Sequence, residues 1–168
     1  MNNSSDFRIL YIEDELPLCD LFKMAVGSSG YSIDVAHNGK DGLALCAEHQ
    51  YDVVAIDYQL PDMTGIDIIR KLLADDPDLP ILMVTGKGDE RIADEAMALG
   101  VANYVIKGDE KVYLELIPDI IDSLLEQAER GQKQLGANRA VKDLSLHFGK
   151  SQFRSSILAG LSLLPTKA

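Results

Sequence analysis

The sequence predicts an α/β fold, a doubly wound five-stranded parallel sheet of strand order 2-1-3-4-5 with helices on both faces. Through residues 1–130, short apolar runs rich in β-branched residues alternate with longer amphipathic stretches. This alternation is typical of repeated βα units. The runs at 53–56 and 81–84 are continuously apolar, as expected of strands that are buried on both faces. Right-handed crossovers between parallel strands then favour the order 2-1-3-4-5.

Each expected element has a local reason in the sequence. Runs rich in Val, Ile and aromatic residues favour strands, which we expect at residues 7–12, 31–36, 51–56, 81–84 and 103–106. The amphipathic stretches between them predict helices at residues 15–26, 39–49, 65–74 and 89–99, and from about 111 onward. Gly27 and Gly30 end the first helix, and Asn38 opens the second. Pro77 and Pro80 bound the turn before the fourth strand.

The last 38 residues differ from the rest of the chain in charge. Residues 131–168 carry six basic residues against one acid, a net charge of +5, whereas ten basic and 26 acidic residues give residues 1–130 a net charge of −16. We therefore expect an α/β domain at 6–130 and a basic, helical tail or connector at 131–168, whose role stays open. Apolar positions recur at helical spacing on either side of Gly149 and predict two short amphipathic helices there.

The composition is that of a globular chain, with 46% hydrophobic and 26% charged residues. The net charge of −11 disfavours direct DNA binding by this chain, because such binding needs Lys and Arg to neutralise phosphates. Cys19 and Cys46 form neither a disulfide framework nor a C-x-x-C motif. Residues 1–6 lack the order of a signal peptide, and no apolar run nears the roughly 20 residues that span a bilayer. We expect a cytoplasmic protein without membrane insertion.

Polar residues stand at or just after the carboxyl ends of four expected strands. They are Glu13 and Asp14, Asp57, Thr85, and Lys107. In an open α/β sheet, ligands bind at this edge. Three carboxylates in one pocket repel one another unless a cation lies between them. Because Glu13, Asp14 and Asp57 offer only oxygen ligands, the sequence favours Mg²⁺ over zinc as that cation.

This set of groups suits phosphoryl transfer, in which positioning and charge neutralisation provide most of the catalysis. Asp57 would be the nucleophile and form an acyl phosphate. Mg²⁺ and Lys107 would neutralise the transferring oxygens, and Thr85 would donate a hydrogen bond to one of them. A phosphatase of the haloacid dehalogenase type also uses an aspartate nucleophile. It normally shows D-x-D, however, and residue 59 is glutamine, so we regard this alternative as the weaker one.

Four short motifs occur in order at these strand ends. They are YIEDE at 11–15, IDYQLPDMTG at 56–65, VTG at 84–86 and YVIK at 104–107. Each is weak alone, but their joint appearance at four strand ends is specific. Over about residues 6–130 the chain thus resembles a response regulator receiver domain of two-component signalling, which has the CheY-like variant of the flavodoxin fold. The resemblance does not extend to residues 131–168.

The resemblance implies a site and a reaction. Asp57 would accept a phosphoryl group from a phosphohistidine on a sensor histidine kinase or a phosphotransfer protein. Mg²⁺ would be held by Glu13, Asp14, Asp57 and the backbone carbonyl of Gln59. The chain would catalyse its own phosphorylation and dephosphorylation, with no turnover of a separate substrate.

The resemblance also implies a switch. Phosphorylation would draw Thr85 inward, and the ring of Tyr104 would turn from solvent into the space that Thr85 leaves. This repacking shifts the population between two states of the surface that binds partners. The expected partners are a downstream protein or a missing output domain, and a homodimer is a further alternative.

One departure from the family pattern concerns Lys107. The usual Lys-Pro pair is Lys107-Gly108 here, and a trans peptide is expected because a cis non-proline bond costs about 2.5–4 kcal/mol. The approach of Lys107 to the pocket is therefore less certain.

Two other functions stay open, namely a pseudo-receiver that binds partners without phosphorylation, and a receiver that belongs to a larger multidomain protein.

Overall fold

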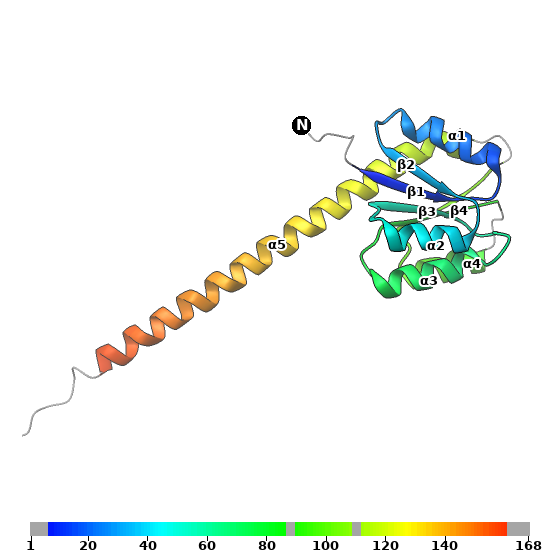
Figure 1. The fold of residues 1–168 in the computed structure, drawn as a ribbon. Helices are drawn as coiled ribbons and strands as arrows, with labels where there is room; N and C mark the ends of the chain where they lie inside the picture. Colours follow the sequence, from blue (N-terminus) through cyan, green and yellow to red (C-terminus); the bar gives the residue numbers. More distant parts are fainter. Residues whose placement is uncertain (1–6, 87–89, 109–111, 161–168) are drawn as a thin grey trace, which may run out of the picture. The chain divides into compact units, whose positions relative to one another are not determined.

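The computed structural model describes residues 7–86, 90–108 and 112–160, and it describes side chains up to residue 136 within these ranges. The strands are β1 (Arg8–Ile12), β2 (Ser32–Ala36), β3 (Val53–Asp57), β4 (Ile81–Thr85) and β5 (Asn103–Ile106). The helices are α1 (Leu16–Gly27), α2 (Gly39–Glu48), α3 (Gly65–Asp75), α4 (Glu90–Leu99) and α5 (Tyr113–Gly160). All pairs of strands are parallel and the order is β2-β1-β3-β4-β5 (Figure 1), so the predicted fold class is confirmed.

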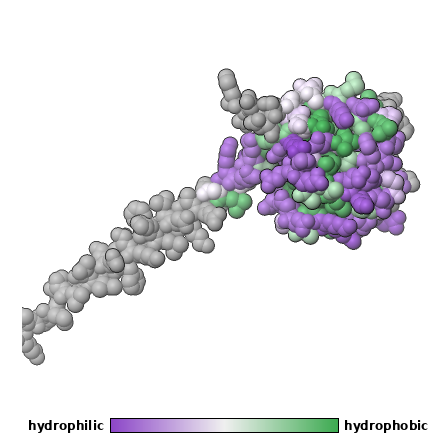
Figure 2. Space-filling model, viewed as in Figure 1, coloured by the Kyte–Doolittle hydropathy of each residue, from purple (hydrophilic) through white to green (hydrophobic). Residues whose placement is uncertain are grey.

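The helices cover the sheet as two layers. α1 and the first part of α5, residues 113–125, lie on one face, and α2, α3 and α4 lie on the other (Figure 1). Successive residues of the central strands alternate between the two cores: Val53 and Ala55 pack on the α1–α5 side, whereas Val54 and Ile56 pack on the opposite side. This double burial explains why the central runs are continuously apolar. The space-filling view shows a largely hydrophilic surface interrupted by apolar patches (Figure 2).

The strand register brings the carboxyl ends of the strands to one edge of the sheet. Ile12 pairs with both Ala36 and Ile56, Asp57 with Val84, and Thr85 with Ile106. The residues that follow β1, β3, β4 and β5 therefore begin their loops at the same edge, where ligands bind in open α/β sheets.

Two helices at this edge begin with side-chain caps. Asn38 accepts a hydrogen bond from the backbone N–H of Asp41 at the start of α2, as the sequence predicted. Thr64 and Asp67 form a reciprocal capping box at the start of α3. These caps fix the ends of the loops that follow β2 and β3.

The C-terminal region differs from the expectation in one respect. The chain divides into two compact units, Met1–Ala128 and Glu129–Ala168. The backbone remains helical through Gly149 to Gly160, so the prediction of two short helices separated at Gly149 is wrong. Glycine costs only about 1 kcal/mol relative to alanine inside a helix, which weakens a helix without ending it.

Among the helices of the described ranges, we find none with the length and apolarity needed to cross a membrane.

Candidate functional site

Three carboxylates meet at the carboxyl edge of the sheet. Asp57 is the last residue of β3, and Glu13 and Asp14 follow β1. One carboxylate oxygen from each lies within 4.8 Å of the other two. Glu13 and Asp57 are buried, whereas Asp14 is exposed. Oxygen donors without sulfur or nitrogen fit a hard ion such as Mg²⁺, and the exposed Asp14 leaves room for bound water.

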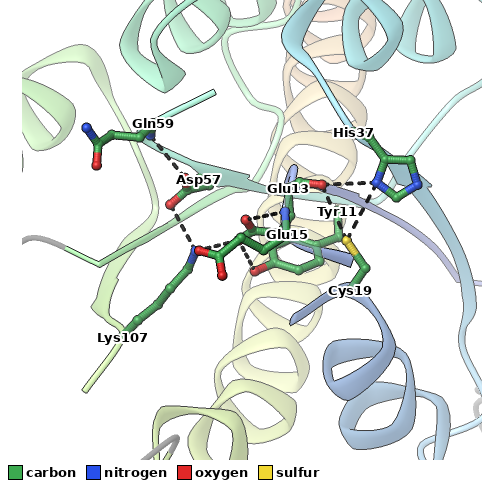
Figure 3. A network of polar contacts seen from close by, with 8 residues as sticks. All are labelled: Tyr11, Glu13, Glu15, Cys19, His37, Asp57, Gln59 and Lys107. Carbon is green, nitrogen blue, oxygen red and sulfur yellow. Dashed lines mark hydrogen bonds and ion pairs between the residues drawn. The ribbon is translucent and has the colours of Figure 1, made fainter. Parts of the chain in front are cut away.

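Lys107 joins two of these carboxylates. Its Nζ lies 3.1 Å from Oδ1 of Asp57 and donates a hydrogen bond to Oε2 of Glu13 (Figure 3). Its side chain is only 10% exposed. The Lys107–Gly108 peptide is trans, so the lysine reaches the pocket without the cis geometry that the family's usual proline allows. The trans peptide before Gly108 therefore does not keep Lys107 out of the pocket.

Glu13 is fully buried, and its carboxylate accepts three hydrogen bonds. The hydroxyl of Tyr11 donates to Oε2 over 2.9 Å, the ammonium of Lys107 donates to the same oxygen, and the backbone N–H of Glu15 donates to Oε1 over 3.2 Å (Figure 3). Burial, and next the charge of Glu13, raise the pKa of Tyr11, so its hydroxyl keeps its proton at neutral pH and remains a donor. A buried charge with this many partners is stable in the fold only while those partners stay in place.

The backbone of Glu13 is also fixed. Its N–H donates to the carbonyl of Ala36 over 2.9 Å. Its carbonyl oxygen lies 3.3 Å from Sγ of Cys19 and 3.2 Å from Nδ1 of His37 (Figure 3). Burial raises the pKa of the Cys19 thiol to about 11, so the thiol stays protonated and donates. These contacts hold the loop that presents Glu13 and Asp14.

Asp57 is a carboxylate whose ionised form is disfavoured. Burial raises the pKa of Asp57 to about 6, while the positive charge of Lys107 opposes the rise and the negative charge of Glu13 adds to it. The backbone N–H of Gln59 donates to Oδ2 over 3.0 Å. At pH 7 to 8 Asp57 is therefore mainly ionised, and burial from water leaves its charge poorly solvated, which suits a nucleophile.

The loop after β3 is tied to α2 by Asp62. Its two carboxylate oxygens each accept a backbone N–H, from Gly39 and from Lys40, both over 2.8 Å. The hydrogen bond from Gly39 leads the causes that lower the pKa of Asp62. Because Asp62 and Gly39 are far apart in sequence, no local pattern indicates this contact. It fixes the loop that carries Gln59.

Gly65 closes the same loop against β3, and a substitution there should be destabilising. Its N–H donates to the carbonyl of Tyr58 over 2.8 Å, and a Cβ at Gly65 would collide with the backbone carbonyl of Asp57. We expect Gly65→Ala to lower the free energy of unfolding by about 1–3 kcal/mol, since backbone has to move. Urea unfolding checks this, with Gly86→Ala as the control, because a Cβ there meets nothing within 4 Å. Equal stability of the two variants would contradict the expectation.

Thr85 and Tyr104 lie on the neighbouring strands. Thr85 ends β4, is 1% exposed, and its carbonyl accepts the N–H of Lys107 over 2.8 Å. Tyr104 lies in β5, is partly buried, and packs against the core on the α2–α4 side. The structure therefore brings Glu13, Asp14, Asp57 and Lys107 together, places Thr85 beside Lys107 through the backbone, and sets Tyr104 in the adjoining core.

This arrangement matches a known family. A family model described as the response regulator receiver domain matches residues 9–117. The chain belongs to this family. A receiver domain therefore accounts for the fold and for the motifs at the four strand ends.

Curated relatives of this receiver are longer proteins. The regulatory protein TcrX of Mycobacterium tuberculosis, named as a probable transcriptional regulator, is 34% identical over 142 residues, which cover 82% of this chain and 58% of TcrX. The transcriptional regulatory protein ResD of Bacillus subtilis is 30% identical over 107 residues, covering 64% of this chain and 44% of ResD. The chain thus spans about half the length of the curated relatives it matches.

Solved receiver structures have the same fold. The response regulator TrrA of Thermotoga maritima, solved in complex with Mg(2+)-BeF, is 26% identical with a TM-score of 0.63, covering 71% of this chain and 99% of that one. A CheY-like receiver protein of Methanospirillum hungatei is 25% identical, also with a TM-score of 0.63, covering 72% and 98%. Both solved chains are matched almost completely by 71–72% of this chain.

Proposed function

We propose that this receiver accepts a phosphoryl group on Asp57 from a phosphohistidine of a sensor histidine kinase or phosphotransfer protein. The observation that carries the proposal is the meeting of a buried, poorly solvated Asp57 with Lys107 and two further carboxylates at one strand edge. Glu13, Asp14, Asp57 and the backbone carbonyl of Gln59 would hold Mg²⁺, which when bound neutralises negative charge on the phosphoryl oxygens. The Mg(2+)-BeF complex of the relative TrrA supports this choice of ion.

The residues of the chain have separate roles in the transfer. An oxygen of Asp57 attacks phosphorus, the bond from phosphorus to the histidine nitrogen breaks, and that nitrogen keeps the electron pair and takes up a proton. The ammonium of Lys107, already 3.1 Å from Oδ1, neutralises the incoming charge. Thr85 donates a hydrogen bond to a phosphoryl oxygen. No separate substrate is turned over, so the reaction is a modification of the protein itself.

The phosphorylated state would act through other proteins. Inward movement of Thr85 and rotation of Tyr104 would repack the core between β5 and α4, and thereby change the population of two surface states. We assign residues 6–130 to the receiver and 131–168 to a basic, helical tail or connector whose role stays open. The output partner would be a downstream protein or an output domain beyond this segment, since several matched relatives are named as transcriptional regulators and the match covers only 43–58% of their length. We place this function in the cytoplasm.

Intact mass after incubation with acetyl phosphate tests the proposal. We expect one phosphoryl adduct that requires Mg²⁺ and is lost in Asp57→Asn. Asp62→Asn is the matched control, because Asp62 lies in the same loop but binds the start of α2; this variant should still form the adduct. If wild type gave no adduct with Mg²⁺ in a rapid measurement, the chain would be a pseudo-receiver that binds partners without phosphorylation.

A further inference from the structure

Tyr11 places a hydroxyl against the acidic pocket from inside the core. It lies in β1, two residues before Glu13, and both residues are fully buried. Its ring stacks on Phe22 of α1, with the ring centroids 4.0 Å apart and an angle of 18° between the planes. A tyrosine has two side-chain torsions, and close packing in the core fixes both. The hydroxyl is therefore a donor at a set position.

The packing of β1 does not require this hydroxyl. Phenylalanine would fill the same space and stack on Phe22 without bringing a polar group into the core. Burying a hydroxyl costs free energy unless a hydrogen bond compensates for it. The compensating acceptor is Oε2 of Glu13, 2.9 Å away (Figure 3). The tyrosine at this position is thus explained by Glu13 rather than by the core.

Glu13 has two donors of fixed position and one donor on a flexible chain. The Tyr11 hydroxyl is fixed by packing, and the N–H of Glu15, 3.2 Å from Oε1, is fixed by the backbone. The third donor is the ammonium of Lys107, which shares Oε2 with Tyr11. A carboxylate offers about four lone-pair sites, so one site on Oε1 remains. These contacts are therefore compatible with the proposed role of Glu13 in holding Mg²⁺.

Lys107 takes its position from the carboxylates that it bridges. Its ammonium is carried on a flexible stem of four carbons. The ammonium donates to Oε2 of Glu13 and lies 3.1 Å from Oδ1 of Asp57 (Figure 3). Since Tyr11 and Lys107 share Oε2, a displacement of this oxygen displaces the ammonium relative to Asp57. The position of the ammonium matters, because misplacing a group that stabilises charge slows a reaction that depends on positioning.

We propose that Tyr11 is a positioning residue for phosphoryl transfer: its hydroxyl fixes Oε2 of Glu13, and this oxygen holds the ammonium of Lys107 beside Asp57. The inference rests on the proposed phosphorylation of Asp57. Tyr11 touches neither Asp57 nor the phosphoryl group in this role and acts only through Glu13 and Lys107. Its effect on the reaction should therefore depend on the presence of Lys107.

A double-mutant cycle tests this dependence. The readout is the rate of the Mg²⁺-dependent acetyl phosphate adduct at saturating Mg²⁺, in wild type, Tyr11→Phe, Lys107→Met and the double variant. Tyr11→Phe should slow the reaction about tenfold in the wild-type background. In the Lys107→Met background the same change should slow it by less than about twofold, because the group that Tyr11 positions is gone.

Tyr51→Phe is the matched control. The Tyr51 hydroxyl also donates to a carboxylate, Oδ2 of Asp34, over 2.8 Å, and Tyr51 is also buried. Tyr51 precedes β3, whereas Asp57 ends that strand, so this pair lies away from the pocket. Both variants should lose stability in urea, since each leaves a carboxylate with one donor fewer. Only Tyr11→Phe should slow the adduct.

A second measurement needs neither phosphorylation nor a folded Lys107→Met variant. Nitrogen-15 NMR of lysine ammonium groups, in EDTA, follows the exchange of the Lys107 ammonium protons with water. Hydrogen bonds and burial slow this exchange, and the Lys107 side chain is only 10% exposed. The exchange should be faster in Tyr11→Phe than in wild type and unchanged in Tyr51→Phe.

The outcomes separate this inference from the proposed function. Equal slowing of the adduct by Tyr11→Phe in both backgrounds, or no slowing in wild type, would show that Tyr11 only stabilises the fold. Unchanged ammonium exchange in Tyr11→Phe would show that Lys107 keeps its position without the hydroxyl. If wild type forms no adduct at all, the proposed function fails, and the role of Tyr11 in the transfer fails with it.

Discussion

Replacing Asp57 with asparagine should make the protein more stable at neutral pH, although the same change removes the proposed phosphorylation site. The pKa of Asp57 is raised by burial from 3.8 to about 6. A pKa difference of one between the folded and unfolded states corresponds to about 1.4 kcal/mol, so the ionised carboxylate costs up to about 3 kcal/mol of folding free energy at pH 7.5. Asparagine keeps an oxygen for Lys107 and carries no charge, so this cost disappears.

The sign of the pH dependence follows from proton binding. Between about pH 4 and pH 6 the folded protein holds a proton on Asp57 that the unfolded chain has lost, so the contribution of Asp57 to stability falls as the pH rises through this window. Below pH 4 both states are protonated, and wild type and Asp57→Asn should converge. Urea unfolding from pH 4 to pH 8, with EDTA to remove metal, measures the difference.

Asp62→Asn provides a control of opposite sign. Hydrogen bonds from Gly39 and Lys40 help lower the pKa of Asp62, so its contribution is present above the pKa of the unfolded chain and is lost as the pH falls through the folded value. Asp62→Asn should therefore be less stable than wild type at neutral pH and should approach it in acid. A lower stability of Asp57→Asn than of wild type at pH 7.5 would contradict the account of Asp57.

The sequence predicted the site residues that lie at or just after the ends of strands. The apolar run before Asp57 and the run before Thr85 are local patterns, and parallel strands place their carboxyl ends at one edge whatever the details of packing. For the same reason, the positions of Glu13 and Asp14 in the chain predicted them in the pocket, whereas the approach of Lys107 became clear only from its contacts with Asp57 and Glu13. The strand order followed from the same patterns together with crossover handedness.

The contacts that hold the site could not be predicted in this way. His37 meets the carbonyl of Glu13 because β2 pairs with β1 in a particular register, and Tyr113 joins the core that holds Tyr11 and Phe22 only because α5 packs on the same face of the sheet as α1. From sequence alone, an aromatic residue in a core strand, such as Tyr11, is expected only to fill the apolar core. The structure shows that its hydroxyl also donates a hydrogen bond to Glu13. Gly149 was expected to break the helix, but the low helix propensity of glycine costs only about 1 kcal/mol, and the helix continues through it.

Replacing Lys107 with methionine should produce the largest loss of stability among the variants considered. Glu13 is fully buried and Lys107 is its counter-charge. Burial by itself lowers the pKa of Lys107, yet the hydrogen bond to Glu13 and the charges of Asp57 and Glu13 outweigh it and raise the pKa above 10.5. The attraction therefore exceeds the desolvation cost of the ammonium, and this stabilisation is fully present at neutral pH and lost only as the pH rises through the folded value.

We expect Lys107→Met to lower the free energy of unfolding by about 3–5 kcal/mol, the range for breaking a buried ion pair from one side. Urea unfolding at pH 7.5 with EDTA measures the loss, and Lys71→Met on the exposed surface of α3 should stay within about 0.5 kcal/mol of wild type. The cause is tested by adding Glu13→Gln to the methionine variant. Because the uncompensated charge is then removed, part of the stability should return, and Tyr11 can still donate to the new amide oxygen. The contrary result would be a double variant that is less stable than Lys107→Met by as much as Glu13→Gln alone destabilises wild type. The two residues would then contribute independently, and the ion pair would not stabilise this pocket.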